Sequence, residues 1–173
     1  QLPSGTPALE YFDLEDDYVF EIGLTPNRAD AASHIGTARD LKAVLHKEVR
    51  WPSVQTFKID SNKRPIQVIV GNTDACPRYS GVTITNVTVK ESPAWLQQRL
   101  RSIGLTPINN IVDITNFILH EIGQPLHAFD LKEVKGNKII VKTLPEGSDF
   151  ITLDEKVRKL KNTDLMICNG ESE

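Results

Sequence analysis

The sequence predicts an α+β fold, in which helices pack on a mixed or antiparallel sheet. Isoleucines recur at helical spacing between positions 111 and 122, a period typical of an amphipathic helix. Residues 66–70 and 78–89 are rich in Val, Ile and Thr, which are enriched in strands. Beyond position 136, short apolar runs alternate with turns of Gly, Pro and Asn, which indicates antiparallel strands.

The composition is that of a soluble globular protein, with 173 residues of which 39% are hydrophobic and 25% charged. The net charge of −3 and the pI near 5.8 give no overall attraction to nucleic acid, so a nucleic-acid partner must meet a local patch. No apolar run is long enough to span a bilayer, and the start does not have the pattern of a signal peptide. Cys76 and Cys168 form no CxxC motif, and we expect two reduced thiols in a cytoplasmic protein. The first residue is not Met, which fits a piece cut from a longer chain, with processing of the chain start as the alternative.

The first part of the chain predicts a linker, a strand and a helix. Residues 1–17 are polar and acidic, and residues 18–22 have the aromatic and branched side chains of a strand. After a turn, a helix is expected over 28–45, capped by Asp30 or Ser33. The expected buried side of this helix comprises Ile35, Ala38, Leu41 and Leu45.

A domain boundary is expected in the loop-rich stretch 51–65, which holds one short strand candidate at 54–59. This linker separates residues 1–50 from a second domain over 66–173. The strands expected in the second domain are 66–70, 78–89, 138–144, a hairpin of 149–153 with 157–160, and 163–168.

A helix is expected after Ser92 and Pro93, because serine caps a helix and proline suits the first helical position. Gly104 is placed to end this helix. Its expected buried face comprises Trp95, Leu96, Leu100 and Ile103.

The chain is organised around a second helix, over 109–122, and the loop that follows it. Asn109 or Asn110 caps its start, and Gly123 ends it in the left-handed conformation that a side chain resists. A proline two residues later prevents the helix from resuming, and the loop then presents His127. One helix face carries Ile111, Ile114, Ile118 and Ile122, and the opposite face carries Asp113, Asn116 and His120.

The motif NNIVDITNFILHEIGQPLHAFD, residues 109–130, closely resembles the signature of the B3/B4 domain in the beta subunit of bacterial phenylalanyl-tRNA synthetases. LTPNRADAASHIGTARDLKAVL resembles the closing segment of the B1 region in the same subunits, and CPRYSG also resembles the family. The alternative is a helix and loop of an unrelated α+β domain, and GQPLHAFD after this helix counts against it. The resemblance implies the tail of a B1-like region over 1–50 and the first part of a B3/B4-like editing domain over 66–173.

The resemblance also implies a function. Phenylalanyl-tRNA synthetases join phenylalanine to tRNA(Phe), using ATP and Mg²⁺ at a site in the alpha subunit, and they assemble from two alpha and two beta subunits. The expected partners are therefore the alpha subunit and tRNA(Phe), and no cofactor is expected to bind this chain itself. The B3/B4 domain hydrolyses tyrosine wrongly attached to tRNA(Phe). Some parts of the family pocket, a Gly-Gly segment and a tyrosine-recognising glutamate, match no position up to 173, so we expect the isolated chain to be inactive.

No motif in the sequence assembles a catalytic set without this resemblance: there is no Walker loop, GxSxG, HExxH or Cys/His metal spacing. The resemblance assigns His127 to the editing pocket, where it would orient the ester or the attacking water, with a loop-fixing hydrogen bond as the alternative. It assigns Asn116 to substrate binding, with a helix–loop structural bond as the alternative. Thr106 is also assigned to substrate binding, and it stands where other bacterial members have arginine, so one contact to the tRNA end or the substrate is lost or replaced.

Arginine's planar fork suits phosphate and carboxylate, so Arg78 is a further substrate-binding candidate, with a structural ion pair at a strand edge as the alternative. Arg28 and His34 are other possible ligand contacts. We favour instead an ion pair of Arg28 with a local acid, and a surface position for His34.

Two other functions compete with editing. A non-catalytic module would bind the tRNA end or another subunit through a polar helix face that has only an architectural role. A free-standing deacylase of the same fold is the third reading. The B1-like segment at 18–45 argues against it, because a lone editing domain has no need of that segment.

Overall fold

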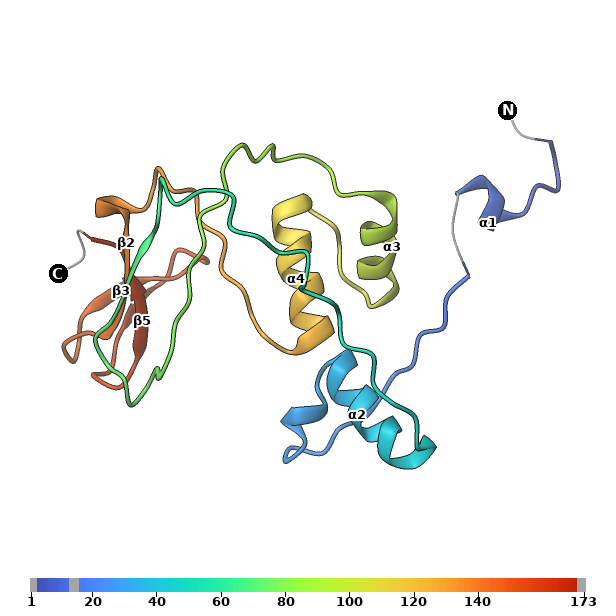
Figure 1. The fold of residues 1–173 in the computed structure, drawn as a ribbon, viewed down its shortest axis with the longest axis horizontal. Helices are drawn as coiled ribbons and strands as arrows, with labels where there is room; N and C mark the ends of the chain where they lie inside the picture. Colours follow the sequence, from blue (N-terminus) through green and yellow to red (C-terminus); the bar gives the residue numbers. More distant parts are fainter. Residues whose placement is uncertain (1–2, 13–15, 171–173) are drawn as a thin grey trace. The chain divides into compact units, whose positions relative to one another are not determined.

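The computed structural model describes residues 3–12 and 16–170 as an α+β fold, as predicted (Figure 1). The chain groups into two compact units that interleave along the sequence. Unit 1 comprises residues 1–56 and 88–128, and unit 2 comprises 57–87 and 129–173. The domain assignment made from the sequence remains a prediction.

Unit 1 contains the helices of the fold. Their bounds are α1 Ala8–Tyr11, a 3-10 turn η1 Ala29–Ala31, α2 His34–Leu45, α3 Ala94–Ser102 and α4 Asn110–Ile122. In Figure 1, α4 and α3 lie side by side, although a loop separates them in sequence. No helix among the described residues is long and apolar enough to cross a membrane.

The helix expected over 28–45 begins later than predicted. η1 comes first, and α2 starts at His34 because the Ser33 hydroxyl accepts the N–H of Gly36 at 3.0 Å. Ser33 is therefore the cap, and of the two predicted alternatives, Asp30 and Ser33, the second is confirmed. Of the expected buried side, Ile35 is buried, whereas Leu41 and Leu45 are about half exposed.

Two expected strands, 18–22 and 54–59, are not strands. Their side chains are exposed, and no segment within residues 3–12 and 16–170 forms a strand ladder with them. A sequence of high β-propensity forms a strand when it has a partner to pair with and a surface to cover, and neither is present here.

α3 starts one residue after Pro93, but Ser92 does not cap it, which corrects the sequence prediction. The Ser92 hydroxyl instead donates to the carboxylate of Asp113. Leu96 and Leu100 are buried as expected. The other two members of the expected buried face are partly exposed, Trp95 at 56% and Ile103 at 39%, and Trp95 packs edge-on against Phe117 at 5.7 Å between ring centroids.

α4 has the ends that the sequence predicts. The Asn109 side chain accepts the N–H groups of Ile111 and Val112 at 3.0 and 3.1 Å, and Gly123 has a φ of +76°. The two faces differ from the prediction. Asp113, expected on a polar face, is fully buried, whereas Ile114 and Ile122 of the apolar face are 48% and 42% exposed.

Unit 2 is built on a mixed sheet in the order β1–β2–β5, with bounds Gln67–Val70, Lys138–Thr143 and Leu165–Cys168. β1 and β2 are parallel, with Val68 opposite Ile139, and β2 and β5 are antiparallel, with Val141 opposite Ile167. A separate hairpin joins β3 Asp149–Ile151 to β4 Val157–Lys159. All of these strands match predicted ones to within a few residues.

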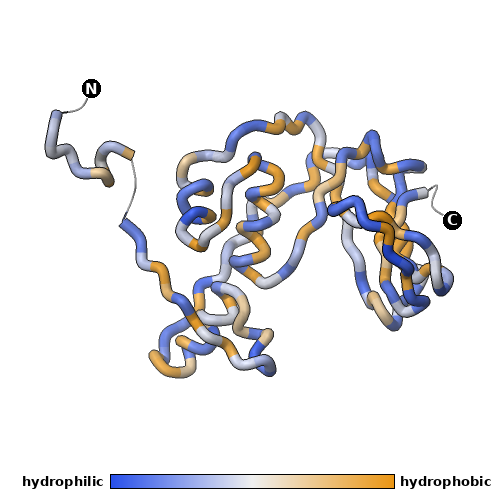
Figure 2. The backbone as a smooth tube through the Cα atoms, turned by 180° about the vertical axis from the view of Figure 1, so that it is seen from behind, coloured by the Kyte–Doolittle hydropathy of each residue, from blue (hydrophilic) through white to orange (hydrophobic). Residues whose placement is uncertain are grey.

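The core of unit 2 consists of Val134, Ile139 and Val141, with Ile66, Cys76, Tyr79 and Leu131 packed against it. Burial raises the pKa of the Tyr79 phenol, and the nearby Cys76 adds to this shift. Cys76 and Cys168 are free thiols, as expected. Figure 2 shows that apolar residues are also spread along the loops and extended segments, outside this small core.

The long strand expected at 78–89 is absent. A Cβ built on Gly81 would lie 2.9 Å from Ile66 Cγ2 and 3.1 Å from Val68 Cγ2, so this segment packs closely on side chains of the first strand. The segment forms no ladder of backbone hydrogen bonds with a described strand. The Thr83 hydroxyl is buried there without a hydrogen-bond partner among the described residues.

Candidate functional site

Three of the four candidate substrate or catalytic residues lie in unit 1. Asn116 is half-buried on α4, Thr106 is exposed in the loop between α3 and α4, and His127 is exposed in the loop after Gly123. No hydrogen bond of the Asn116 side-chain amide is found in the part of the chain that the structure describes. Its amide therefore has free donors and acceptors for a ligand.

Arg78 belongs to unit 2 and is exposed. It follows Cys76, whose thiol donates to the Arg78 carbonyl at 3.5 Å. Within the described ranges the guanidinium has no ion pair, and no strand forms at 78–89, so the alternative of an ion pair at a strand edge is not supported.

Asp113 is the buried polar centre of unit 1, with 0% of its surface exposed. Its Oδ2 accepts from the Ser92 hydroxyl at 2.5 Å, and its Oδ1 accepts from the Ile108 backbone N–H at 2.8 Å. Both partners are donors, which is what an ionised carboxylate needs when it leaves water. Asp113 also lies in the first turn of α4, where the helix dipole favours a negative charge.

A second set of bonds ties the segment before α3 to the start of α4. The Asn110 N–H donates to the Lys90 carbonyl at 2.9 Å, and the Lys90 N–H donates to Asn110 Oδ1 at 3.1 Å. The Asn110 side-chain amide donates to the Thr88 carbonyl at 3.0 Å. The first turn of α4 is thus fixed through both backbone and side chain.

The far end of α4 contacts α2. His34 Nδ1 lies 2.9 Å from the carbonyl oxygen of His120, one of the last carbonyls of the helix, and a ring N–H donated there satisfies that group. A Cβ on Gly123 would lie 3.4 Å from Ser33 Cβ, so the backbone at Gly123 passes close to Ser33. His34 is exposed, as expected, but it also holds the helix end from which the His127 loop departs.

Arg28 forms the local ion pairs that we favoured over a ligand contact. Its guanidinium contacts Asp30 at 3.0 Å and Asp40 at 2.7 Å. The hydrogen bond from Arg28 holds the pKa of the Asp30 carboxyl below its ordinary value, and the same bonds raise the pKa of Arg28.

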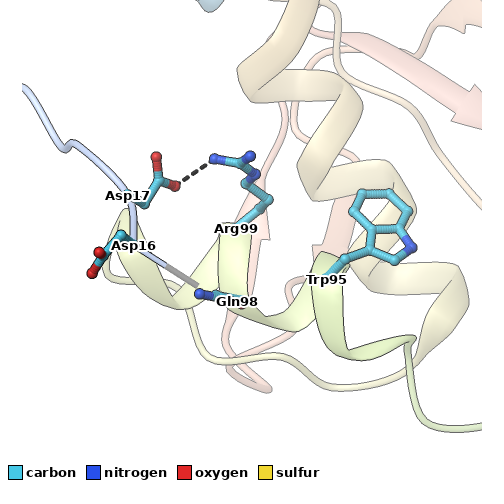
Figure 3. Close-up of a pocket in the computed structure, with 5 residues that line it drawn as sticks. All are labelled: Asp16, Asp17, Trp95, Gln98 and Arg99. Carbon is cyan, nitrogen blue, oxygen red and sulfur yellow. Dashed lines mark hydrogen bonds and ion pairs between the residues drawn. The ribbon is translucent and has the colours of Figure 1, made fainter. Parts of the chain in front are cut away.

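Each unit has a shallow cavity among its described residues. The first, of about 150 Å³, is lined by Asp16, Asp17, Trp95, Gln98 and Arg99, and an ion pair joins Asp17 to Arg99 (Figure 3). The second, of about 170 Å³, is lined by Phe129, Asp130, Glu133, Val134, Ile139, Ile167, Cys168 and Asn169. Neither includes a candidate residue from the sequence.

In the described part of the chain, no three His, Cys, Asp or Glu side chains converge. The sequence interpretation missed the pairing of Ser92 with Asp113. Its signal was ambiguous, because a serine before a proline at a helix start is usually a cap.

Comparison with known proteins gives one family and many relatives. A model of the B3/4 domain family matches residues 75–173. The phenylalanine–tRNA ligase beta subunit of Bacteroides thetaiotaomicron is 57% identical over 96% of this chain and 21% of its own length. Those of Porphyromonas gingivalis and Fusobacterium nucleatum are 53% and 45% identical, over 99% and 98% of this chain and 21% of their own length. The chain therefore spans about a fifth of the length of these relatives.

Proposed function

Because this chain belongs to the B3/4 domain family, we propose that it is part of a phenylalanine–tRNA ligase beta subunit and contributes to an editing site that hydrolyses mischarged tyrosyl-tRNA(Phe). The observation that carries this proposal is the capped helix α4 followed by GQPLHAFD, which lies inside the matched range 75–173. The parent enzyme would attach phenylalanine to tRNA(Phe) in the cytoplasm, with ATP and Mg²⁺ used at the alpha subunit. Its assembly would contain two alpha and two beta subunits.

The chemistry of editing calls for polar side chains in the pocket. A pocket shaped for an apolar ring rejects an added hydroxyl only weakly, whereas one with a polar group waiting for that hydroxyl discriminates by about 10⁴-fold or more. The Asn116 amide has donor and acceptor atoms of the required kind.

In the reaction, a water oxygen attacks the ester carbonyl carbon, and the bond from that carbon to the ribose oxygen of the tRNA end breaks. The water loses a proton and the ribose oxygen gains one, so tyrosine and free tRNA are released. We propose that the His127 imidazole orients the water or accepts its proton. Thr106 would contact the tRNA end or the substrate. Arg78 would bind a phosphate or a carboxylate.

The second candidate function is a non-catalytic module that binds the tRNA end or another subunit. It is favoured by one observation: the cavities of about 150 and 170 Å³ described above are not lined by His127, Asn116 or Thr106.

A deacylation assay separates the two functions. It uses the full-length alpha and beta subunits with tRNA(Phe) that carries tyrosine. His127→Ala and Asn116→Ala should each lower the rate of tyrosine release by about 10²-fold, the low end for a lost acid–base or positioning group, and leave phenylalanine charging intact. His46→Asn and Asn162→Ala, which change exposed residues of the same types, should leave both rates unchanged. Full deacylation by both site variants would favour the binding module.

A further inference from the structure

We propose that Asp113 is a positioning residue for the deacylation described above: its buried carboxylate, held by Ser92, fixes the Thr106 loop against the helix that carries Asn116. This inference rests on the proposed editing function. It concerns the group of Ser92, Asp113 and the Ile108 N–H, which we call the α4 anchor.

The α4 anchor is a buried group of polar atoms joined by two hydrogen bonds. Asp113 is fully buried, and Ser92 is 5% exposed. A buried carboxylate that loses one donor is left with an unsatisfied charge, which is far more costly than a lost surface bond. The two bonds, at 2.5 and 2.8 Å, are as short as charge-assisted bonds usually are. The anchor therefore resists sliding of any of its three segments.

Two of the three segments that the anchor joins carry candidate residues of unit 1: the loop with Thr106 and the helix with Asn116. Ile108 is two residues after Thr106, so its N–H bond to Asp113 sets where the Thr106 loop lies on the helix. Asn116 is three residues after Asp113 in α4, and residues at this spacing share one helix face. Rotation or translation of α4 relative to the loop would therefore change where Asn116 lies relative to Thr106.

Ser92 is itself held in place from the other side. Its carbonyl accepts from Gln97 Nε2 at 2.7 Å, and Gln97, 8% exposed, accepts from Arg101 through Oε1 at 2.7 Å. The Ser92 hydroxyl is thus aimed at Asp113 by α3, so that α3 and α4 are linked through polar groups as well as through Leu96 and Leu100.

The anchor affects the reaction rate by fixing where the substrate-binding side chains lie relative to the ester. A reacting group that is misplaced by about 1 Å can lose about 10²-fold in rate, although the misplacing change lies away from the chemistry. Asp113 itself touches no reacting atom in this account, because its carboxylate oxygens are occupied and buried.

The test uses the full-length ligase and tyrosine-charged tRNA(Phe), with kcat and KM of tyrosine release measured well below the melting temperature. Ser92→Ala should lower kcat by about 10-fold while KM and phenylalanine charging change by less than about twofold, because one of two bonds is lost. Asp113→Asn should lower kcat further, since an amide cannot accept from both donors in the same way.

Two control variants separate positioning from general stability. Ser102→Ala removes an α3 hydroxyl that bonds only to Arg99 of its own helix, at 2.8 Å, and should leave kcat unchanged. Leu100→Val weakens the same core without touching the anchor, and at an equal loss of melting temperature it should keep the wild-type kcat.

Each outcome supports or overturns the positioning role of Asp113. A fall in kcat for Ser92→Ala but not for the two controls supports the inference. An equal fall for Leu100→Val, or a joint loss of charging and deacylation, makes the anchor merely structural and overturns it. Unchanged kcat for Ser92→Ala, when His127→Ala and Asn116→Ala slow the reaction, overturns the inference alone. Unchanged kcat in all of these variants overturns the proposed editing function as well.

Discussion

At the scale of single residues, charged side chains in this chain fall into two groups with different consequences. Asp113 is fully buried with two donors, whereas Arg28, Asp30 and Asp40 form their ion pairs at the surface. Water and salt screen the surface pairs, so their effect on stability is small. Their effect on protonation is still measurable.

The Asp30 carboxyl should titrate at a lower pH in the folded chain than in the unfolded chain, because the hydrogen bond from Arg28 favours its charged form. A folded pKa below the unfolded one means that the unfolded chain binds more protons. The stability that this pair contributes is therefore present above the unfolded pKa and is lost as the pH falls through the folded pKa.

Arg28→Ala should raise the pKa of Asp30 toward its ordinary value, as measured by NMR titration of the carboxyl carbon. Lys42→Ala is the matched control, because Lys42 pairs with Glu48 at 2.7 Å and not with Asp30. An unchanged Asp30 titration in Arg28→Ala would contradict the ion pair seen in the structure.

At the scale of elements, the join between η1 and α2 depends on a glycine in close contact. A Cβ on Gly36 would lie 2.3 Å from the Asp30 carbonyl oxygen and 2.7 Å from Ala31 Cα. Both are backbone atoms, which cannot swing aside as the end of a side chain can. The 3-10 turn can therefore fold back on α2 only if residue 36 has no side chain.

Gly36→Ala should lower the free energy of unfolding by about 1–3 kcal/mol, the usual cost of overpacking, although alanine is the better helix former by about 1 kcal/mol. Urea denaturation measures this change. Gly23→Ala is the control, because a Cβ there meets nothing within 4 Å, and it should change the free energy by less than about 0.5 kcal/mol. A stabilised Gly36→Ala chain would show that η1 does not pack against α2 in this way.

The ends of α4 were predictable from the sequence, because local chemistry determines them. Asn109 and Gly123 bound α4 through bonds and backbone angles that involve only a few neighbouring residues. The strands at 67–70 and 138–143 were predictable for a different reason, since each has a partner within the chain. The segments 18–22 and 78–89 have equally strong strand composition but no partner, and a sequence pattern does not reveal whether a partner exists.

The candidate site was predictable to a smaller extent. The resemblance assigned roles to His127, Asn116 and Thr106, and the chemistry of arginine added Arg78. The burial of Asp113 was not predictable, because a helical pattern counts an aspartate as polar and places it outside. Its burial follows from Ser92, 21 residues earlier, and a pairing of this separation leaves no periodic signal.

At the scale of the whole molecule, many large apolar side chains are exposed. Tyr18 is 87% exposed, Phe20 79%, Val44 73% and Leu153 107%, and Figure 2 shows such residues along extended segments of the chain. Exposed apolar surface of this kind marks a place that other protein covers, or a tendency to associate. The cores, around Leu100 and Val141, are small by comparison.

We therefore expect the isolated chain to bind the dye ANS and to self-associate as its concentration rises, as measured by fluorescence and by sedimentation. Replacing Tyr18 and Phe20 together by serine should reduce both signals, because it removes two of the most exposed aromatic rings. Val141→Ala is the contrasting variant: it should cost about 2 kcal/mol of stability, since Val141 is 1% exposed at the centre of the sheet, and it should not reduce association. Near-ultraviolet circular dichroism should stay native-like throughout, which separates exposed surface on a folded chain from a molten state that also binds the dye. A chain that remains monomeric without dye binding would show that these apolar side chains are covered by the chain itself in solution.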